Sequence, residues 1–177
     1  NDWKAVSKLV DEINNLSIDP QFQISIFIVN DASNHDRPVE EKDLVNINSI
    51  KMRSTIVTNW LDESKTDILL IQETKSIDEN FPHKEFEDKG FNVIFSGQKA
   101  YNGVAIASKF KIEEISRNLP IYNDDELEDD QARFLHVKIL NINIICLYLP
   151  NGNPAPGLKF DYKINWMKRL IKYSREI

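Results

Sequence analysis

The side chains best suited to chemistry in this sequence stand where apolar runs end. Glu73 follows the apolar run at 68–71 after Gln72, and Lys75 comes two residues later. A carboxylate at the end of a strand is well placed to bind a hard cation such as Mg²⁺ through oxygen. The commoner use of such a residue is a surface glutamate that caps the strand, and spacing alone favours that interpretation.

Two amides and one phenol occupy comparable positions. Asn46 and Asn48 stand just before a predicted helix that starts near residue 50, where their side chains could orient a metal or a phosphate. The default interpretation is helix capping, in which Asn48 or Ser49 accepts hydrogen bonds from the first N–H groups of the helix. Tyr148 ends a long apolar run, and a tyrosine there is usually a core residue whose hydroxyl reaches the edge.

The histidines and the single cysteine offer no further catalytic group. His35 and His83 lie in predicted loops and His136 lies inside a predicted strand, none of them with an acidic residue at catalytic or ligand spacing. Cys146 lies within an apolar run, so a buried structural thiol is the expected role, and a lone cysteine forms no disulfide framework within this chain. This cysteine usage fits a reducing, cytoplasmic location.

The elements that would position these groups fall into two parts. Residues 2–17 carry apolar side chains at helical spacing, and Asp19-Pro20 ends that predicted helix. A strand at 24–29, a polar loop and a possible linker at 39–43 complete the first part. After residue 45 the pattern predicts a mixed α/β fold rather than a regular βαβ alternation. Its expected helices cover 50–65, 83–89 and 159–175, and its expected strands cover 67–72, 91–95, 103–108, 132–139 and 142–149.

These five strands are expected to form one mostly antiparallel or mixed sheet with the two long helices on one face. The strands at 132–139 and 142–149 should pair as a hairpin, because only Leu140 and Asn141 separate their cores. The strand at 24–29 either takes the place of the first strand of the sheet or stays apart with helix 2–17. Each long helix has one predicted apolar face, made of Ile56, Val57, Trp60 and Leu61 in the first and of Phe160, Ile164, Met167, Leu170 and Ile171 in the second.

The charge distribution neither demands nor excludes a nucleic-acid partner. The net charge of −6 argues against a general nucleic-acid coat protein. Residues 1–45 hold 4 basic and 9 acidic residues, whereas residues 46–177 hold 18 basic and 19 acidic ones, six of the acids in the run 124–130. A locally basic face that touches phosphates is therefore compatible with the acidic total. No run approaches the ~18 apolar residues of a membrane span, so no membrane partner is expected.

Four segments in order resemble one family. They are Asn-Ile-Asn-Ser-Ile at 46–50, Ile-Gln-Glu-Thr-Lys at 71–75, Gly-Gln-Lys-Ala-Tyr-Asn-Gly-Val-Ala-Ile at 97–106 and Leu-Tyr-Leu-Pro-Asn-Gly-Asn-Pro at 147–154. Residues 78–82 and 129–133 also fit. Together they resemble exodeoxyribonuclease III and the related apurinic/apyrimidinic endonucleases of the endonuclease/exonuclease/phosphatase superfamily. The resemblance covers about residues 45–177, and it implies the N-terminal half of a four-layer α/β sandwich of the DNase I-like type.

The resemblance also implies a reaction and a set of roles. The reaction is hydrolysis of a DNA phosphodiester at abasic sites and 3′ ends with Mg²⁺, or with Mn²⁺ in its place, in DNA repair. Glu73 falls on the metal-binding glutamate, with Asn48 beside the metal, while Asn46 and Tyr148 fall on active-site positions. Tyr148 would contact the scissile phosphate. We expect Asn46, Glu73 and Tyr148 to converge at one end of the sheet, because each follows or ends a strand on the same edge. The positions that face DNA are Lys51, Lys75, Tyr101 and Asn151.

Two departures from the family pattern limit this expectation. The Asp-x-Asn pair, a later Asp and the Ser-Asp-His of the second half have no counterpart in residues 155–177, so the chain alone is expected to be truncated and inactive. The opening strand is replaced by the charged residues 40–45. Residues 1–41 instead weakly resemble the start of a family 2 glycosyltransferase, with Asp31 as the strand-end acid.

The resulting expectation is a chain of two parts, a foreign N-terminal segment at 1–44 and a nuclease half at 45–177, joined by fusion, rearrangement or an assembly artefact. The alternatives are another superfamily phosphodiesterase or phosphatase, acting on a phospholipid or inositol phosphate, a nucleotide-sugar-binding module, and an inactive fragment. The segments at 97–103 and 149–154 favour DNA over the lipid substrates. No obligate protein partner is expected.

Overall fold

The computed structural model describes residues 24–25, 49–122 and 129–177. The predicted helix at 2–17, most of the strand at 24–29 and the residues around Asn46 therefore lie outside the described part, and the division at residue 44 stays a prediction. In chain order the described elements are β1 (Ile24–Ser25), α2 (Ile50–Ser64), β2 (Ile68–Gln72), the 3₁₀ turn η1 (Asp78–Asn80), α3 (His83–Glu87), β3 (Asn92–Ser96), β4 (Val104–Ser108), β5 (Glu113–Ser116), β6 (Phe134–Ile139), β7 (Ile142–Leu147) and α4 (Leu158–Tyr173).

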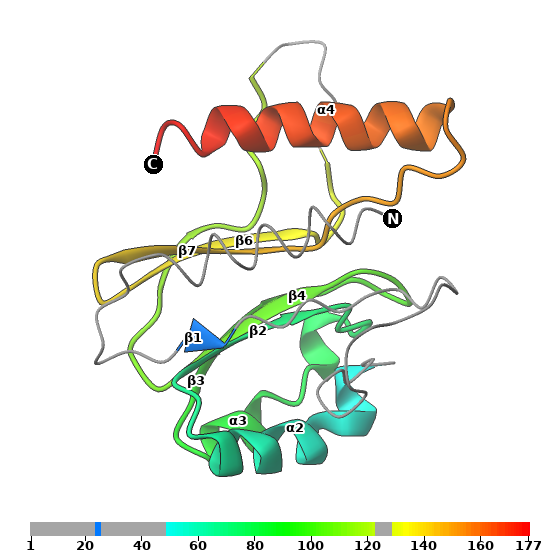
Figure 1. Ribbon diagram of the computed structural model, residues 1–177. Coiled ribbons are helices and arrows are strands. Elements are labelled where there is room, and N and C mark those ends of the chain that lie inside the picture. Colours follow the sequence, from blue (N-terminus) through cyan, green and yellow to red (C-terminus); the bar gives the residue numbers. More distant parts are fainter. Residues whose placement is uncertain (1–23, 26–48, 123–128) are drawn as a thin grey trace, which may run out of the picture.

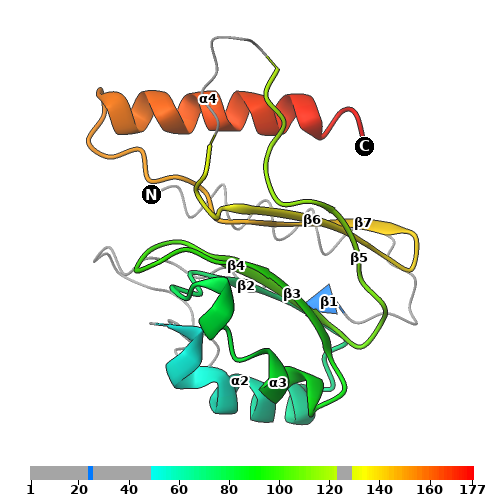
Figure 2. The same cartoon turned by 180° about the vertical axis from the view of Figure 1, so that it is seen from behind.

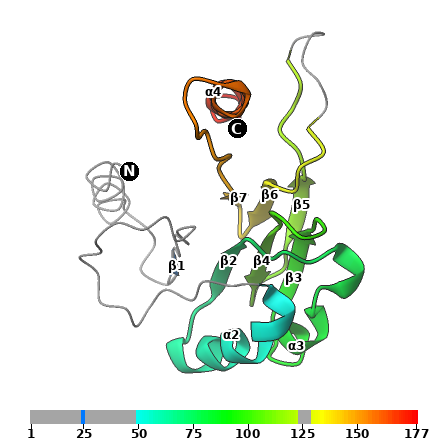
Figure 3. The same cartoon turned by 90° about the vertical axis from the view of Figure 1, so that its right-hand side faces the viewer.

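These elements stack in four layers (Figure 1). Helix α4 covers the sheet β5-β6-β7, which packs face to face on the sheet β1-β2-β4-β3, and helices α2 and α3 cover the far side of that second sheet. The view from behind shows β5 beside β6 (Figure 2), and the side view shows the same order of layers (Figure 3). The predicted fold class, a mixed α/β sandwich, is confirmed.

The prediction of a single sheet with both long helices on one face is wrong. The strands divide into a four-stranded and a three-stranded sheet, and α2 and α4 lie on opposite outer faces. Every residue of β4 is buried, which is typical of a central strand covered on both faces. A buried pattern reports that a strand is covered, but it does not say whether a helix or a second sheet covers it. The short, mostly exposed strand β5 was not predicted, because Glu113-Glu114-Ile-Ser has a charged and weakly apolar pattern.

The predicted hairpin is confirmed. Strands β6 and β7 pair antiparallel from Phe134 opposite Leu147 to Ile139 opposite Ile142. Leu140 and Asn141 both adopt positive φ, 49° and 66°, as the two central residues of a type I′ turn require. In the other sheet, β1 pairs in parallel with β2. The two described residues of the predicted strand at 24–29 therefore lie at the edge of the sheet, as expected if this strand takes the place of the first strand.

Strand β2 shows how two cores arise from one alternating strand. Leu69 and Ile71 point into the core beneath α2 and α3, together with Leu61 and Phe86. Ile68 and Leu70 point the other way, into the core between the sheets, where Cys146 is also buried. Successive side chains of a strand face opposite sides, so a strand that is apolar throughout can serve two layers.

The predicted helix faces are only partly right. In α2, Val57 and Leu61 are buried as expected, but Ile56 is exposed. In α4, Phe160, Met167 and Ile171 of the predicted face are 36–49% exposed, whereas Leu170 is partly buried against the core. The face that meets the sheet instead carries Trp166, Arg169 and Tyr173.

Hydrogen bonds explain the orientation of α4. The Arg169 guanidinium donates to the carbonyl oxygens of Leu119 at 2.6 Å and Pro120 at 3.1 Å. The Tyr173 hydroxyl lies 2.6 Å from Nδ1 of the buried His136 in β6. A buried guanidinium and a buried imidazole need such partners. The free energy of these hydrogen bonds outweighs the cost of leaving Phe160, Met167 and Ile171 exposed. Among the described residues, no helix is both long and apolar enough to cross a membrane.

Candidate active site

Glu73 and Tyr148 meet at the point where the two stacked sheets end. Glu73 follows β2 of one sheet, and Tyr148 follows β7 of the other. The Tyr148 hydroxyl donates a hydrogen bond to Glu73 Oε1. Just before them, Gln72 Nε2 donates to the Leu147 carbonyl, so the two strand ends are joined by side-chain bonds from sheet to sheet. These contacts bring together two residues that lie 75 positions apart in the sequence.

The Glu73 carboxylate is mostly sheltered from solvent. Its side chain is 12% exposed, and Oε2 lies 3.7 Å from Lys75 Nζ, whose side chain is 28% exposed. One carboxylate oxygen therefore faces a phenol and the other faces an ammonium group. This arrangement gathers an acceptor, a neutral donor and a positive charge within a few ångströms, which suits the binding of a phosphate together with a cation.

The backbone around Glu73 is strained. Eight described residues other than glycine have positive φ, and five of them lie in the three segments that meet at this site: Ser49, Glu73, Lys75, Ala100 and Asn102. Left-handed backbone is costly for residues that carry a Cβ, and such residues concentrate at functional sites when the surrounding structure holds them in place.

Main-chain hydrogen bonds hold these strained segments. Thr74 N donates to Gly103 O at 3.2 Å and Lys75 N donates to Asn102 O at 3.0 Å. Ile50 N, at the start of α2, donates to Thr74 O at 3.0 Å. The turn that carries Glu73 is thus fixed on one side by α2 and on the other by the loop before β4.

Gly103 fits where no other residue would. Its φ is +90°, and a Cβ at this position would lie 2.0 Å from Thr74 Oγ1. The segment at 101–103 thus closes over the turn that carries Glu73. Thr74 Oγ1 is itself buried and has no hydrogen-bond partner within the described part of the chain.

Arg133 is a site residue to which the sequence assigned no role. The carbon of its guanidinium lies 5.0 Å from the centroid of the Tyr148 ring, and Nη1 donates to Tyr148 O at 3.2 Å. The segment 129–133 had been matched to the family, so its position was marked in the sequence. Its contact with Tyr148 depends on the pairing of β6 with β7, which the motif does not encode.

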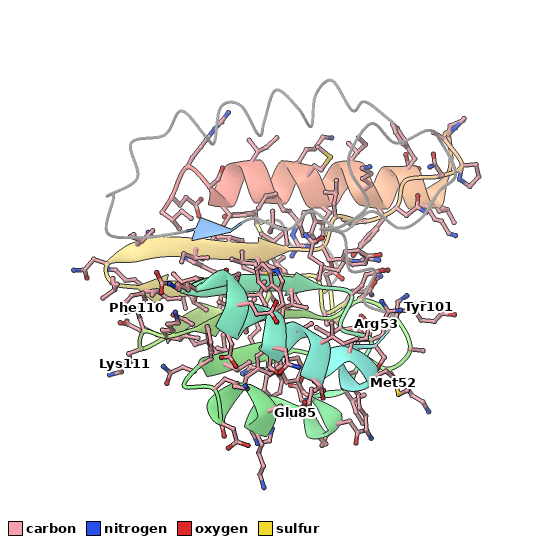
Figure 4. The ribbon with its side chains drawn as sticks, turned by 60° about the horizontal axis from the view of Figure 1, so that its bottom comes forward. Met52, Arg53, Glu85, Tyr101, Phe110 and Lys111 are labelled. Atoms are coloured by element: carbon pink, nitrogen blue, oxygen red, sulfur yellow. The ribbon has the colours of Figure 1, made fainter. Side chains whose placement is uncertain are left out.

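The residues predicted to face DNA lie around the same end of the molecule. Lys51 is exposed in the first turn of α2, directly after Ile50, and Tyr101 is 71% exposed in the loop before β4. Figure 4 shows Met52 and Arg53 of α2 and Tyr101 toward one end of the ribbon. Asn151 is exposed three residues after Tyr148, and its Oδ1 accepts from Asn153 N at 2.9 Å.

Asn46 and Asn48 lie outside the described residues, so their convergence with Glu73 and Tyr148 stays a prediction. In the part of the chain that is described, no three His, Cys, Asp or Glu side chains gather as a metal site. Within residues 49–122 and 129–177, Glu73 is the carboxylate that lies beside the Tyr148 phenol and the Lys75 ammonium group. Mg²⁺ is commonly held by one or two carboxylates together with substrate phosphates and water, so this donor set fits that ion.

His136 in β6 and Cys146 in β7 are both buried and bonded within the protein. His136 is buried, with Nδ1 against Tyr173 and Nε2 3.2 Å from Asn143 Oδ1. Burial raises the pKa of the Cys146 thiol to about 12, and Sγ donates to Ile71 O at 3.5 Å. The prediction of a buried structural thiol is confirmed.

Comparison with known proteins gives a consistent result. Residues 45–169 match the Endonuclease/Exonuclease/phosphatase family. The chain is 30% identical over 129 residues to exodeoxyribonuclease III of Haemophilus influenzae, a match that covers 72% of this chain and 48% of that protein.

Two solved structures are also similar. The first is an AP endonuclease from Archaeoglobus fulgidus, 42% identical, with a TM-score of 0.66 and coverage of 73% of this chain and 48% of that one. The second is the 3′ phosphatase NExo from Neisseria bound to a product DNA hairpin, 33% identical, with a TM-score of 0.67 and coverage of 73% and 49%. The chain spans about half the length of the curated relatives it matches.

Proposed function

The chain belongs to the Endonuclease/Exonuclease/phosphatase family, and we propose that it is the N-terminal half of a DNA-repair nuclease of exodeoxyribonuclease III type. The observation that carries the proposal is the contact between Glu73 and Tyr148, which joins the ends of the two sheets. Its relatives are an exodeoxyribonuclease, an AP endonuclease and a 3′ phosphatase seen with DNA, so a phosphate ester of DNA is the substrate class we infer.

We assign each residue the role that the family resemblance implies. Glu73 would hold Mg²⁺, with Mn²⁺ as a substitute and Asn48 beside it. The chemistry that such an ion supplies when bound is polarisation of a phosphoryl oxygen and stabilisation of the leaving oxygen. The Tyr148 phenol would donate to the phosphate and stabilise the negative charge that develops on it, and Asn46 would contribute to the same site.

The side chains predicted to face DNA would bind the DNA itself. Lys51 and Lys75 would contact phosphates, while Tyr101 offers an exposed ring and Asn151 an exposed amide. Phosphate contacts of this kind weaken as salt rises, since binding releases counterions from the DNA. We therefore expect weak, salt-sensitive binding of duplex DNA by the chain alone.

We expect no incision by the chain alone. Its residues 155–177 contain neither the Asp-x-Asn nor the Ser-Asp-His of the family's second half. General-base catalysis commonly contributes ~10²–10⁴-fold to such a reaction, so loss of the water-activating Asp is by itself a severe deficit. Mg²⁺-dependent incision by the purified chain, abolished by Glu73→Ala, would show that the second half matters less than we infer.

The function is tested by supplying the second half. A chimera of residues 45–177 with the second half of the Haemophilus influenzae relative is assayed on a duplex with one abasic site, with Mg²⁺ and with EDTA. We expect Mg²⁺-dependent incision that Glu73→Ala abolishes and Tyr148→Phe lowers by about 10²–10³-fold, as for loss of one charge-stabilising donor.

Matched controls separate the site from general damage. Glu85→Gln removes a carboxylate that accepts from Thr55 on the helical layer, and Tyr122→Phe removes a phenol that donates to Glu176. Both should leave incision intact. A chimera that folds by circular dichroism but incises neither abasic nor 3′-phosphate DNA would contradict the proposed function.

A further inference from the structure

Arg133 contacts Tyr148 in three ways. Its carbonyl oxygen accepts from Tyr148 N at 2.8 Å, Nη1 donates to Tyr148 O at 3.2 Å, and the guanidinium lies over the ring at 5.0 Å from the centroid. A single side chain thereby fixes both the main chain and the ring face of Tyr148. Arginine suits this task because its planar fork donates in two directions while its face stacks on an aromatic ring.

A chain of amides fixes Arg133 in turn. Arg133 Nε donates to Gln131 Oε1 at 2.8 Å, and the same oxygen accepts from Asn102 Nδ2 at 3.3 Å. Asn102 Nδ2 also donates to Gln98 Oε1 at 2.7 Å, and Ala132 N donates to that oxygen at 3.2 Å. Asn102 is only 6% exposed, so these bonds are sheltered from competition with water.

The same asparagine also holds the segment next to Glu73. Asn102 O accepts from Lys75 N at 3.0 Å, while the neighbouring Gly103 O accepts from Thr74 N at 3.2 Å. The main chain of this loop thus supports the Glu73 turn, and the Asn102 side chain reaches Tyr148 through Gln131 and Arg133. Both members of the candidate catalytic pair rest on one loop, at 98–103.

We propose that Asn102 and Arg133 are positioning residues that keep the Tyr148 phenol against Glu73 by linking the loop at 98–103 to the end of β7. The proposal rests on the function inferred above for Glu73 and Tyr148. Neither residue needs to touch the substrate. Their effect is to limit the positions available to the phenol, and a displacement of about 1 Å at a reacting group can cost ~10²-fold in rate.

Two variants break the link in different places. Arg133→Lys keeps the positive charge but loses the fork that reaches Gln131 and Tyr148 together. Asn102→Gly removes the amide that bonds Gln98 and Gln131, and glycine accepts the local φ of 55° without strain. The control is Arg169→Lys, which alters a comparable arginine on α4 whose fork bonds the carbonyl oxygens of Leu119 and Pro120.

The first measurement is independent of activity. The full chain is labelled with ¹³Cζ-tyrosine, the Tyr148 resonance is assigned with Tyr148→Phe, and each variant is checked for cooperative unfolding in urea. We expect Arg133→Lys and Asn102→Gly to shift the Tyr148 resonance, and Arg169→Lys to leave it in place even where it lowers stability. If the Tyr148 resonance stays unmoved in folded samples of both site variants, the positioning role is overturned.

The second measurement separates this proposal from the proposed function. In the chimera, Arg133→Lys should lower kcat by about 10- to 100-fold with little change in KM, because the loss is one of orientation rather than of DNA contact. An active chimera in which Arg133→Lys changes only KM would contradict positioning and leave the nuclease assignment standing. A folded, inactive chimera with a shifted Tyr148 resonance would contradict the nuclease assignment, while the link between Arg133 and Tyr148 would stand.

Discussion

The two outer helical layers are attached to their sheets by different kinds of contact. Helices α2 and α3 present Val57, Leu61 and Phe86, and the core beneath them is apolar. Helix α4 presents Trp166 together with Arg169 and Tyr173, whose polar atoms bond the chain beneath. One layer is thus held by area removed from water, whereas the other also depends on directed hydrogen bonds.

This difference explains which helix face could be predicted. Periodicity reports where apolar residues recur, so it identifies the buried face wherever burial of apolar area decides the packing. In α4 only part of the predicted apolar face packs on the core, at Leu170, whereas Phe160, Met167 and Ile171 are exposed. The hydrogen bonds of Arg169 and Tyr173 turn a different face toward the sheet. A hydrophobic pattern does not report polar side chains that attach a helix through hydrogen bonds.

The largest expected effect tests the apolar layer. Phe86 is fully buried in α3 and stacks on Phe81 at 5.9 Å between ring centroids. Phe86→Ala should lower the free energy of unfolding by about 3–5 kcal/mol, as for other truncations of buried aromatics, measured by urea titration. Phe160→Ala on the exposed stripe of α4 is the control, with an expected change below ~1 kcal/mol. Equal costs for the two variants would break the comparison between the layers.

A smaller effect tests the hydrogen bonds of α4. Arg169→Met keeps much of the side-chain volume but leaves the carbonyls of Leu119 and Pro120 without this donor. We expect a loss of about 1–3 kcal/mol, the cost of unsatisfied buried polar groups, with faster hydrogen exchange in α4 than in α2. Arg175→Met, at an exposed position just after α4, should change little. A neutral Arg169→Met would mean that Trp166 alone attaches the helix.

The next effect on stability comes from the hydroxyl of Tyr173. Tyr173→Phe removes the partner of His136 Nδ1 while keeping the ring that packs edge-on to Phe134. The expected loss is about 0.5–1.5 kcal/mol in thermal or urea unfolding. Tyr101→Phe, with its hydroxyl on a 71% exposed side chain, provides the matched control and should be silent. If both variants behave alike, the His136 contact contributes nothing to the attachment of α4.

The smallest effect concerns the core between the sheets, which both regions share. Because burial raises the pKa of Cys146 to about 12, the folded protein keeps this proton while the unfolded thiol ionises. Its stabilisation is complete below the unfolded pKa of about 8.5 and is lost as pH rises toward the folded value. By pH 9 the loss should reach about 0.4–0.8 kcal/mol. Cys146→Ala should be less stable at every pH but should lack this pH-dependent loss of stability. If the difference in unfolding free energy between wild type and Cys146→Ala stays constant from pH 7 to 9, the prediction is contradicted.

Much of the strand pattern and the local hairpin could be predicted, whereas the pairing of strands distant in the sequence could not. The hairpin of β6 and β7 follows from two residues between two apolar runs, a local signal. The division into two sheets depends on which strand meets which across the chain, as when β4 pairs between β2 and β3. Strand β5 was missed because an exposed edge strand with Glu113 and Glu114 lacks an apolar pattern.

The meeting of Glu73 and Tyr148 at one end of the sheet was predicted, whereas the contacts that hold them there were not. Glu73 and Tyr148 were named from their segments, and the structure adds that one donates to the other. Arg133 and Asn102 had no assigned role, because their contacts depend on the approach of the loop at 98–103 to the segment before β6. Residue type marks a possible function, whereas the partner of each side chain depends on tertiary structure.

The left-handed backbone of Glu73 has a consequence for laboratory evolution. With φ at 53°, this glutamate occupies a conformation that glycine or asparagine adopts more readily, at a saving of about 1 kcal/mol. A library selected only for heat resistance should therefore enrich Gly or Asn at position 73. A library selected for phosphodiester cleavage in a complete enzyme should return Glu. Sequencing the two pools would measure how strongly selection for catalysis opposes selection for stability at this one residue.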